Sequence, residues 1–276
     1  IADQAILIPN YLLIEKEFGI KHAQVGAVSS IFIVIGAVSA ILWGYWVDKY
    51  SRKQLLVFGV LVGEIPCFLT AFTQNYIQLF LVRALTGMGI GVILPVGYSL
   101  LGDYFPPQER GKIAGWFISA VTLGYLLGAV LAATIGPRLS WRYPVILCST
   151  PNFILVPFFH FLAKEPVRGG TESEIKELVS SGVAYLYKVK LRDFKRIISI
   201  RTNLFLNLQS IPGCILWGIL PTWVITFIAK EKGFTITTAT VIVLIFAMAR
   251  IGGNLCGGYV GDHLYKRSPI QQINFC

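Results

Sequence analysis

Long apolar stretches, separated by short polar or charged segments, recur along the whole chain. Most reach the length of roughly 18 residues that a helix needs to cross a membrane. Because an unpaired backbone group in lipid costs several kcal/mol, each stretch is predicted to be a helix. We expect eight membrane spans. Their predicted limits are Ile1–Glu17, Gln24–Val47, Gln54–Phe72, Tyr76–Leu101, Gly111–Ile135, Trp141–Ala163, Asn203–Ala229 and Thr235–Val260.

Composition and charge place the chain in a membrane. Hydrophobic residues make up 55% of the sequence and charged residues 14%, whereas soluble domains carry about 25% charged residues. Of the 24 basic residues, 16 lie at the connections after the even-numbered spans and 6 at those after the odd-numbered spans. By the positive-inside rule, the even connections and the N-terminus are cytoplasmic. We therefore attribute the net charge of +10 to the orientation of the chain in the membrane rather than to nucleic-acid binding. We expect a multi-pass protein of the plasma or inner membrane.

The connection between the sixth and seventh spans differs from the others. Residues 164–201 carry nine basic and five acidic residues and begin with Pro166 and Gly169. Apolar residues at helical spacing in 171–194 predict an amphipathic helix on the membrane surface. We therefore divide the chain into an N-terminal six-helix bundle (1–163), a cytoplasmic linker (164–201) and two further spans (202–276).

An internal repeat relates the two ends of the chain. A shift of 214 residues without a gap places Lys16-Glu17 on Lys230-Glu231, Gly19 on Gly233, Gly44 on Gly258 and Asp48 on Asp262. Two helices that share only an apolar composition would not be expected to have matching charges at both ends of the span. Spans seven and eight are thus predicted to begin a second copy of a six-span unit, and the chain to be a fragment of a twelve-span protein.

Several local motifs point to one family. Residues 44–53, with Gly44, Asp48, Arg52 and Lys53, resemble the GxxxD(R/K)xxR(R/K) signature of the major facilitator superfamily in its usual place after the second span. The pattern after Arg83, the segment 103–111 and the entry to span six at 140–144 are also similar to that family. The resemblance covers essentially the whole chain.

The resemblance implies an all-α membrane protein of major-facilitator type. It implies a six-helix N-terminal bundle followed by the first two helices of the C-terminal bundle, and alternating access to a site near the midplane. Asp48 and Arg52 are four residues apart and share a face if the turn between them is helical. The alternative is that these charges only set topology. The predicted cytoplasmic gate consists of Gly44, Asp48, Arg52, Lys53, Asp103 and Asp262.

Charged residues inside the spans are the candidates for a substrate or proton pathway, because each is costly to place against lipid. There are four of them, Asp3, Glu64, Arg83 and Arg250, and Asn207 adds a polar group in span seven. In the family that the motifs resemble, spans one and four line the cavity, which favours Asp3 and Arg83. Arg250 aligns with Gly36 in the repeat, so it is present in one copy only. For Asp3 and Arg83 the alternative is a buried structural ion pair.

Other chemistry is not supported by the sequence. It holds no GxxxxGK[ST] nucleotide motif and no HExxH motif, and its three histidines are dispersed. We therefore expect no enzyme, no cofactor and no bound metal. The hypothesis is a monomeric secondary active transporter of a small organic solute, either anionic or lipid-like, with proton coupling suggested by Asp3 and Glu64. The alternative is a transporter-like sensor that binds a ligand without moving it.

One branch of the family shares further features. Asp3 followed by Pro9, the segment 44–53 and residues 217–221 look similar to Spinster-like carriers of lipids and organic anions. That branch often has Glu in span four, where this chain has Ile90.

Overall fold

The computed structural model describes residues 2–169, 171, 193, 199–268 and 270. Every regular element in these residues is helical. The elements are α1 (Ala2–Ala5), η1 (Ile8–Asn10), α2 (Tyr11–Phe18), α3 (His22–Val47), α4 (Arg52–Thr70), α5 (Tyr76–Ile90), α6 (Ile93–Tyr104), η2 (Pro107–Glu109), α7 (Arg110–Ile135), α8 (Arg142–Leu162), α11 (Arg201–Lys232) and α12 (Ile236–Arg267). The predicted amphipathic helix in 171–194 falls almost entirely outside the described residues.

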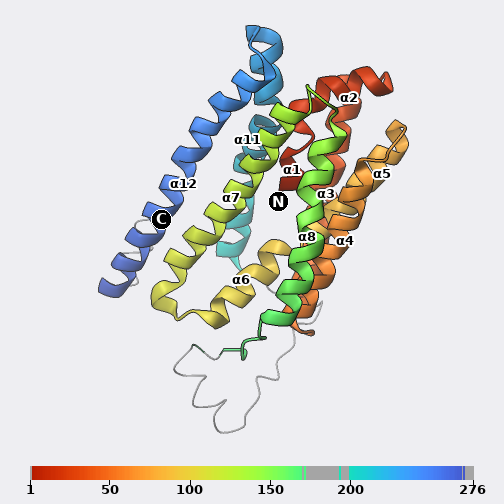
Figure 1. Cartoon of the computed structure of the whole chain (residues 1–276). Helices are drawn as coiled ribbons and strands as arrows, with labels where there is room; N and C mark the ends of the chain where they lie inside the picture. The colour runs from red at the N-terminus through yellow and green to blue at the C-terminus, as the bar shows by residue number, and fades with distance from the viewer. Residues whose placement is uncertain (1, 170, 172–192, 194–198, 269, 271–276) are drawn as a thin grey trace.

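The long helices run side by side, as a membrane bundle requires (Figure 1). In the described residues six segments are long and apolar enough to cross a membrane, and they correspond to the predicted spans two to six and eight. Large apolar side chains such as Ile41, Leu127 and Phe161 lie exposed on their outer surfaces. Such a surface suits lipid rather than water, because lipid tails favour apolar contact.

The first predicted span is not one helix, which corrects the prediction. It consists of α1, η1 and α2. Pro9 has no N–H to donate to the carbonyl of Ala5, so the helical ladder stops there. The amide of Asn10, which is fully buried, instead donates to the carbonyl of Ala132 on α7 at 3.0 Å. This side-chain hydrogen bond fixes the broken segment to α7.

The fourth predicted span also contains a break. α5 ends at Ile90 and α6 begins at Ile93. Pro95 cannot donate to the carbonyl of Gly91, which accounts for the interruption. Two glycines on neighbouring helices make close packing here possible. A Cβ at Gly89 would overlap the backbone of Gly63 on α4, so these helices approach to backbone contact.

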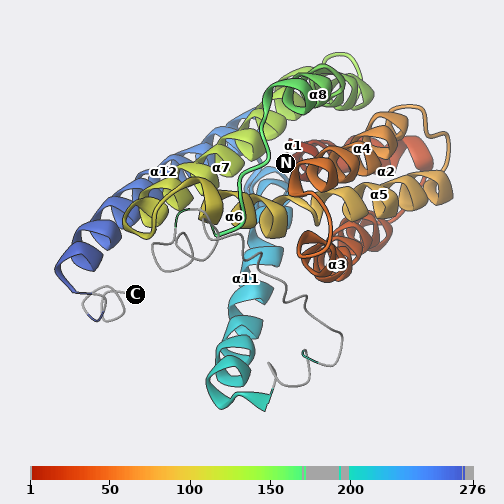
Figure 2. The ribbon, with the colours of Figure 1, turned by 90° about the horizontal axis from the view of Figure 1, so that it is seen from below.

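The view from below separates the helices into groups (Figure 2). α3, α4 and α5 pack together, α8 packs on α4, and α7 lies along α12. α11 touches the rest of the bundle near its C-terminal end, where Ile225 is buried, and its other end projects away from the bundle. The seventh predicted span is therefore a helix, Arg201–Lys232, with most of one end exposed.

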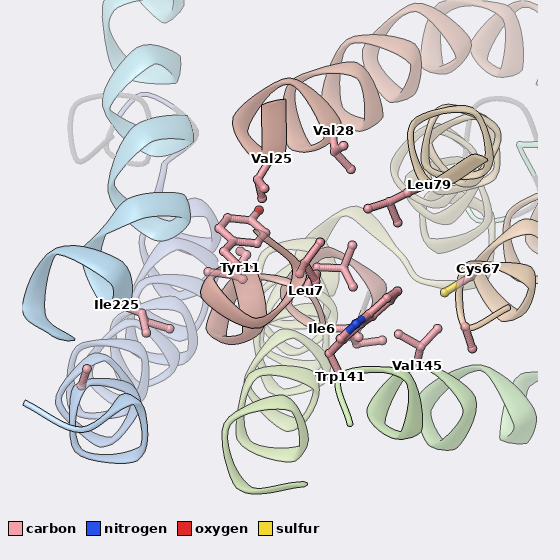
Figure 3. Close-up of a cluster of buried hydrophobic side chains, with 14 residues drawn as sticks. Ile6, Leu7, Tyr11, Val25, Val28, Cys67, Leu79, Trp141, Val145 and Ile225 are labelled. Carbon is pink, nitrogen blue, oxygen red and sulfur yellow. The ribbon is translucent and has the colours of Figure 1, made fainter. Parts of the chain in front are cut away.

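The main apolar core surrounds the start of the chain (Figure 3). Ile6, Leu7 and Tyr11 are buried against side chains from several helices, among them Leu79 and Trp141. A second core cluster gathers around Trp43, Val92 and Val96. The first of these clusters holds the broken first segment in the interior.

The predicted repeat has a local structural counterpart. Gly19 ends α2 and Gly233 ends α11, and both adopt the left-handed conformation, with φ of 62° and 73°. Glycine is favoured there because it carries no Cβ. We call this end of the bundle the Gly19 end, and the opposite end, where α3 and α12 finish, the Asp48 end.

Candidate functional site

Three of the four predicted intramembrane charges come together inside the bundle. Asp3 on α1, Glu64 on α4 and Arg83 on α5 are 3%, 6% and 3% exposed. A carboxylate oxygen of Asp3, one of Glu64 and the sulfur of Cys67 all lie within 4.8 Å of one another. Arg83 Nη2 donates to the backbone carbonyl of Asp3 at 2.6 Å. We call Asp3, Glu64, Cys67 and Arg83 the interior cluster.

The interior cluster is not fully satisfied by hydrogen bonds within the described residues. Asp3 Oδ1, Glu64 Oε2 and Arg83 Nη1 are buried without a partner. The Arg83 guanidinium lies 4.6 Å from the ring centroid of Phe32, so one face is covered by an aromatic side chain. Buried polar atoms are normally paired. The cluster therefore has the capacity to bind an additional polar or charged group.

Arg250 and Asn207 are exposed, whereas the charged residues of the interior cluster are buried. Arg250 is exposed on α12 and is close enough to Tyr125 on α7 to interact electrostatically with it. Asn207 is exposed on α11, where its amide donates to the Asn203 carbonyl in the preceding turn at 2.7 Å. These two residues belong to the second repeat.

A second polar cluster lies at the Asp48 end. Arg52 is 2% exposed and forms an ion pair with Asp103. Arg52 Nε also donates to Glu165 Oε1 at 3.0 Å, and Arg52 Nη2 donates to the Pro166 carbonyl at 2.8 Å. The predicted pairing of Arg52 with Asp103 is thus present in the structure.

The condition under which Asp48 and Arg52 would share a helix face, a helical turn between them, is not met. α3 ends at Val47, and Ser51 is extended with ψ of 123°, so the turn is not helical. The Ser51 hydroxyl accepts from the Gln54 N–H and caps the start of α4. The Asp48 carbonyl accepts from Arg168 at 2.5 Å. Arg52 finds its acidic partners on α6 and in the linker instead.

Glu165 and Arg168 were missed by the sequence analysis, which treated the linker as one surface segment. The Glu165 carboxylate accepts from the backbone N–H groups of Arg52 and Lys53 at 3.0 and 2.9 Å. Arg168 donates to the carbonyls of Val47 and Tyr50 at 2.7 and 3.0 Å. The available signal was a carboxylate and a guanidinium flanking Pro166, directly after the sixth span.

The charge state of Glu165 follows from these contacts. Burial by itself would raise the pKa of Glu165. The Lys53 N–H, the Ser51 hydroxyl and Arg52 donate to the carboxylate, and together they hold its pKa below its ordinary value. The start of linker 164–201 is therefore bound to the bundle through an ionised carboxylate. We call the contacts of Arg52 with Asp103 and Glu165, together with those of Arg168 with the turn after α3, the linker clasp.

Asp262 joins the two repeats at the Asp48 end. Its carboxylate accepts from the N–H groups of Gly111 and Lys112 at 2.9 and 2.6 Å. These are among the first residues of α7, whose N–H groups have no partner within the helix. Asp262 is 7% exposed and thus caps a helix of the other repeat. Gly44 lies near Pro95, since a Cβ added at Gly44 would lie 4.0 Å from the Cβ of Pro95.

The Gly19 end also connects the repeats. Tyr11 and Trp223 have ring centroids 6.0 Å apart. Lys230 Nζ lies 2.7 Å from His22 Nε2. Both ends of the described bundle therefore carry contacts between the two repeats, with the interior cluster between them.

Comparison with known proteins gives a consistent result. The family model described as Major Facilitator Superfamily matches residues 1–273. The chain is 26% identical over 269 residues to a probable 4-methylmuconolactone transporter of Cupriavidus pinatubonensis, covering 94% of this chain and 59% of that protein. It is 23% identical over 270 residues to the cis,cis-muconate transport protein of Acinetobacter baylyi, covering 96% and 64%. The chain thus spans about three fifths of the length of these relatives.

Solved structures share the fold. A bacterial homolog of the human lysosomal transporter Spinster, in an inward-facing and unoccupied conformation, superposes with a TM-score of 0.70 at 18% identity. The match covers 97% of this chain and 60% of that one. At this identity the likeness shows the common fold and not a common substrate.

Proposed function

Since the chain belongs to the Major Facilitator Superfamily, we propose that the protein is a secondary active transporter of a small organic anion that works by alternating access. The six apolar helices and the family make it an integral membrane protein. Relatives named for muconate and 4-methylmuconolactone transport support the class of solute, because both compounds carry carboxylate groups.

The observation that carries the proposal is the unpartnered Nη1 of Arg83. A guanidinium inside a membrane is costly unless it is paired. Arg83 is 3% exposed, its Nη2 is hydrogen-bonded, and its Nη1 has no hydrogen-bond partner among the residues that the structure describes. Guanidinium groups bind carboxylates strongly, through parallel N–H···O bonds. We infer that Arg83 binds the carboxylate of the solute, and that Arg250 and Asn207 approach the solute from the second repeat.

The contacts at the Asp48 end support a gate on the predicted cytoplasmic side. Asp262 bonds α12 to α7 across the boundary between the repeats. Arg52 and Asp103 hold the nearby helix ends of the first repeat together. In this proposal, opening toward the cytoplasm breaks the Asp262 contact, while Gly44, Asp48 and Lys53 shape the turn beside the linker clasp.

The test is uptake of radiolabelled cis,cis-muconate and 4-methylmuconolactone into proteoliposomes that contain the protein expressed from its complete gene. We expect saturable uptake, and we expect Arg83→Gln to reduce it at least tenfold. Losing one charged hydrogen bond costs about 1.5–3 kcal/mol, and 1.4 kcal/mol corresponds to a factor of ten.

The matched control is Arg138→Gln, because Arg138 is exposed in the connection after α7. This variant should retain uptake. Uptake that survives Arg83→Gln would remove Arg83 from the binding site. Absence of uptake for both anions would refute the proposed class of solute.

A further inference from the structure

The outer side of the contact between α7 and α12 carries side chains that the proposed transport site does not use. The two helices lie side by side (Figure 1, Figure 2). They approach closely, because a Cβ added at Gly115 on α7 would lie 2.7 Å from the backbone oxygen of Asn254 on α12. Beside this contact, Lys112 Nζ lies 5.3 Å from the ring centroid of Tyr259, which is exposed. A lysine of the first repeat and a tyrosine of the second therefore meet at the surface.

Basic and aromatic side chains continue from this pair along both helices. On α7, Trp116 follows Lys112 by four residues and is exposed. On α12, His263 and Lys266 follow Tyr259 by four and seven residues, and both are exposed. Residues at these spacings share one face of a helix. We call Lys112, Trp116, Tyr259, His263 and Lys266 the seam patch.

The same two faces are apolar farther from the Asp48 end. On α7, Leu123 and Leu127 follow Trp116 by seven and eleven residues, and on α12 Met248 precedes Tyr259 by eleven. All three apolar side chains are exposed. An apolar surface that ends in tryptophan, tyrosine and basic residues is typical of a helix where it leaves the hydrocarbon region of a membrane.

The seam patch lies on the side of α12 opposite the proposed solute contact. Tyr259 and Arg250 are nine residues apart, which is about two and a half turns at 3.6 residues per turn. Arg250 interacts electrostatically with Tyr125 on α7. The contact between α7 and α12 thus separates the seam patch from Arg250, and the patch is not part of the proposed solute pathway.

The first repeat supports the exposure of this face of α12. The shift of 214 residues places Tyr45 on Tyr259 and Val34 on Met248. Val34 is exposed, although α3 packs against α5. At the Asp48 end of the same face, Lys49 Nζ lies 3.8 Å from the ring centroid of Tyr45. The equivalent face of the first repeat therefore also lies at the surface, with a tyrosine and a basic residue at its end.

The charge of the region favours an anionic partner. Lys112, Lys266 and the exposed Arg267 are basic, and the acidic residues in the adjoining turns are Glu109 and Asp262. The Asp262 carboxylate is bound to the N–H groups at the start of α7, so it is already engaged. Lysine and arginine near a membrane surface are attracted to anionic headgroups, and basic pockets between helices on the cytoplasmic side bind them. The Asp48 end is the predicted cytoplasmic side.

We propose that the seam patch is a binding site for an anionic phospholipid. Lys112 and Lys266 bind the phosphate of the headgroup, and the acyl chains lie along Leu123 and Met248. The bound lipid contacts both repeats at once. This inference does not depend on the solute, and it goes beyond the proposed function.

Quenching of tryptophan fluorescence by brominated lipids tests the site. The protein expressed from its complete gene is reconstituted in phosphatidylcholine vesicles that contain phosphatidylglycerol or phosphatidylcholine with dibrominated acyl chains. The difference between each variant and the same variant with Trp116→Phe isolates the signal of Trp116. Each lysine contributes about fivefold to the attraction, so we expect Trp116 to prefer phosphatidylglycerol over phosphatidylcholine by about 25-fold. Lys112→Gln and Lys266→Gln should each lower this preference about fivefold.

Two control variants separate the site from a general effect of charge. Arg138→Gln removes one positive charge at the Gly19 end and should leave the preference unchanged. Lys112→Arg keeps the charge and should keep the preference. Equal quenching of Trp116 by the two lipids in the wild-type protein would overturn the proposal. A preference that survives in the double variant Lys112→Gln/Lys266→Gln would overturn it as well.

A competition experiment distinguishes a lipid from a soluble phosphate compound. Inorganic phosphate in excess over lipid, compared with chloride at the same ionic strength, should not displace phosphatidylglycerol from Trp116. Displacement would assign the patch to a soluble anion and refute the lipid site. Because no solute is present, the result is independent of the uptake assay. Uptake together with equal quenching would reject the lipid site alone, and lipid preference without uptake of either anion would reject the class of solute alone.

Discussion

The Asp262 contact makes a sharp prediction about how the two repeats separate. The carboxylate accepts two backbone N–H groups at the start of α7, at 2.9 and 2.6 Å, and is 7% exposed. A hydrogen bond to a charged group contributes about 1.5–3 kcal/mol, and loss of a helix N-cap costs about 0.5–2 kcal/mol. Asp262→Asn keeps one neutral acceptor, so we expect a loss of about 2 kcal/mol.

This loss of free energy shifts the equilibrium between two states, one in which the ends of α7 and α12 are joined and one in which they are separated. The contact exists only while α12 and α7 lie together at the Asp48 end, so its loss penalises the joined state alone. About 2 kcal/mol corresponds to a shift of about 30-fold in the equilibrium constant toward separation.

Pulsed electron paramagnetic resonance can measure this shift. Spin labels at Gln108 and Lys266, both exposed, report the separation of the two helix ends in a background whose native cysteines are replaced by alanine. Asp262→Asn should transfer population from the short distance to a longer one. Glu109→Gln is the control, because Glu109 precedes α7 without a side-chain capping bond. Identical distance distributions for the wild type and Asp262→Asn would refute the gating role of Asp262.

Two more predictions concern stability, measured by thermal unfolding of the purified protein. Because the pKa of Glu165 is lowered in the folded state, the stabilisation is complete well above its ordinary pKa and is lost as the pH falls through the lowered value. Glu165→Gln should therefore lower the Tm at pH 7, and the difference from wild type should vanish in acid; a difference that persists there would contradict the ion-pair account. Gly89→Ala should destabilise the protein by about 1–3 kcal/mol or more, because its Cβ would overlap the Gly63 backbone. Gly102→Ala, whose Cβ meets nothing within 4 Å, should be tolerated, and equal melting of the two alanine variants would refute the close packing of α4 and α5.

The sequence was informative wherever a local pattern carries the information. Apolar length predicted the long helices, and the six that meet the length and hydropathy criteria agree with the prediction. The 214-residue repeat predicted equivalent turns, and Gly19 and Gly233 adopt the same conformation. The signature at 44–53 identified the family that the whole-chain match establishes.

The sequence failed where a single residue decides between continuing and ending a helix. The first span was predicted as one helix because most of its residues are apolar, yet Pro9 and the buried Asn10 interrupt it. Asp48 and Arg52 would share a face only if the turn between them were helical, and Ser51 instead starts a new helix. Spacing along the chain predicts a shared face only if the backbone conformation between the residues is known.

The sequence by itself determined that this chain crosses a membrane repeatedly, that its two ends share a pattern at a spacing of 214 residues, and which charges lie in apolar spans. It did so because length, hydropathy and repetition are properties of consecutive residues. Only the tertiary structure decided that Asp3, Glu64 and Arg83 meet in the interior while Arg250 is exposed, and that Glu165 binds the start of α4. Those contacts join helices distant in sequence, and their partners depend on how each helix is rotated and packed.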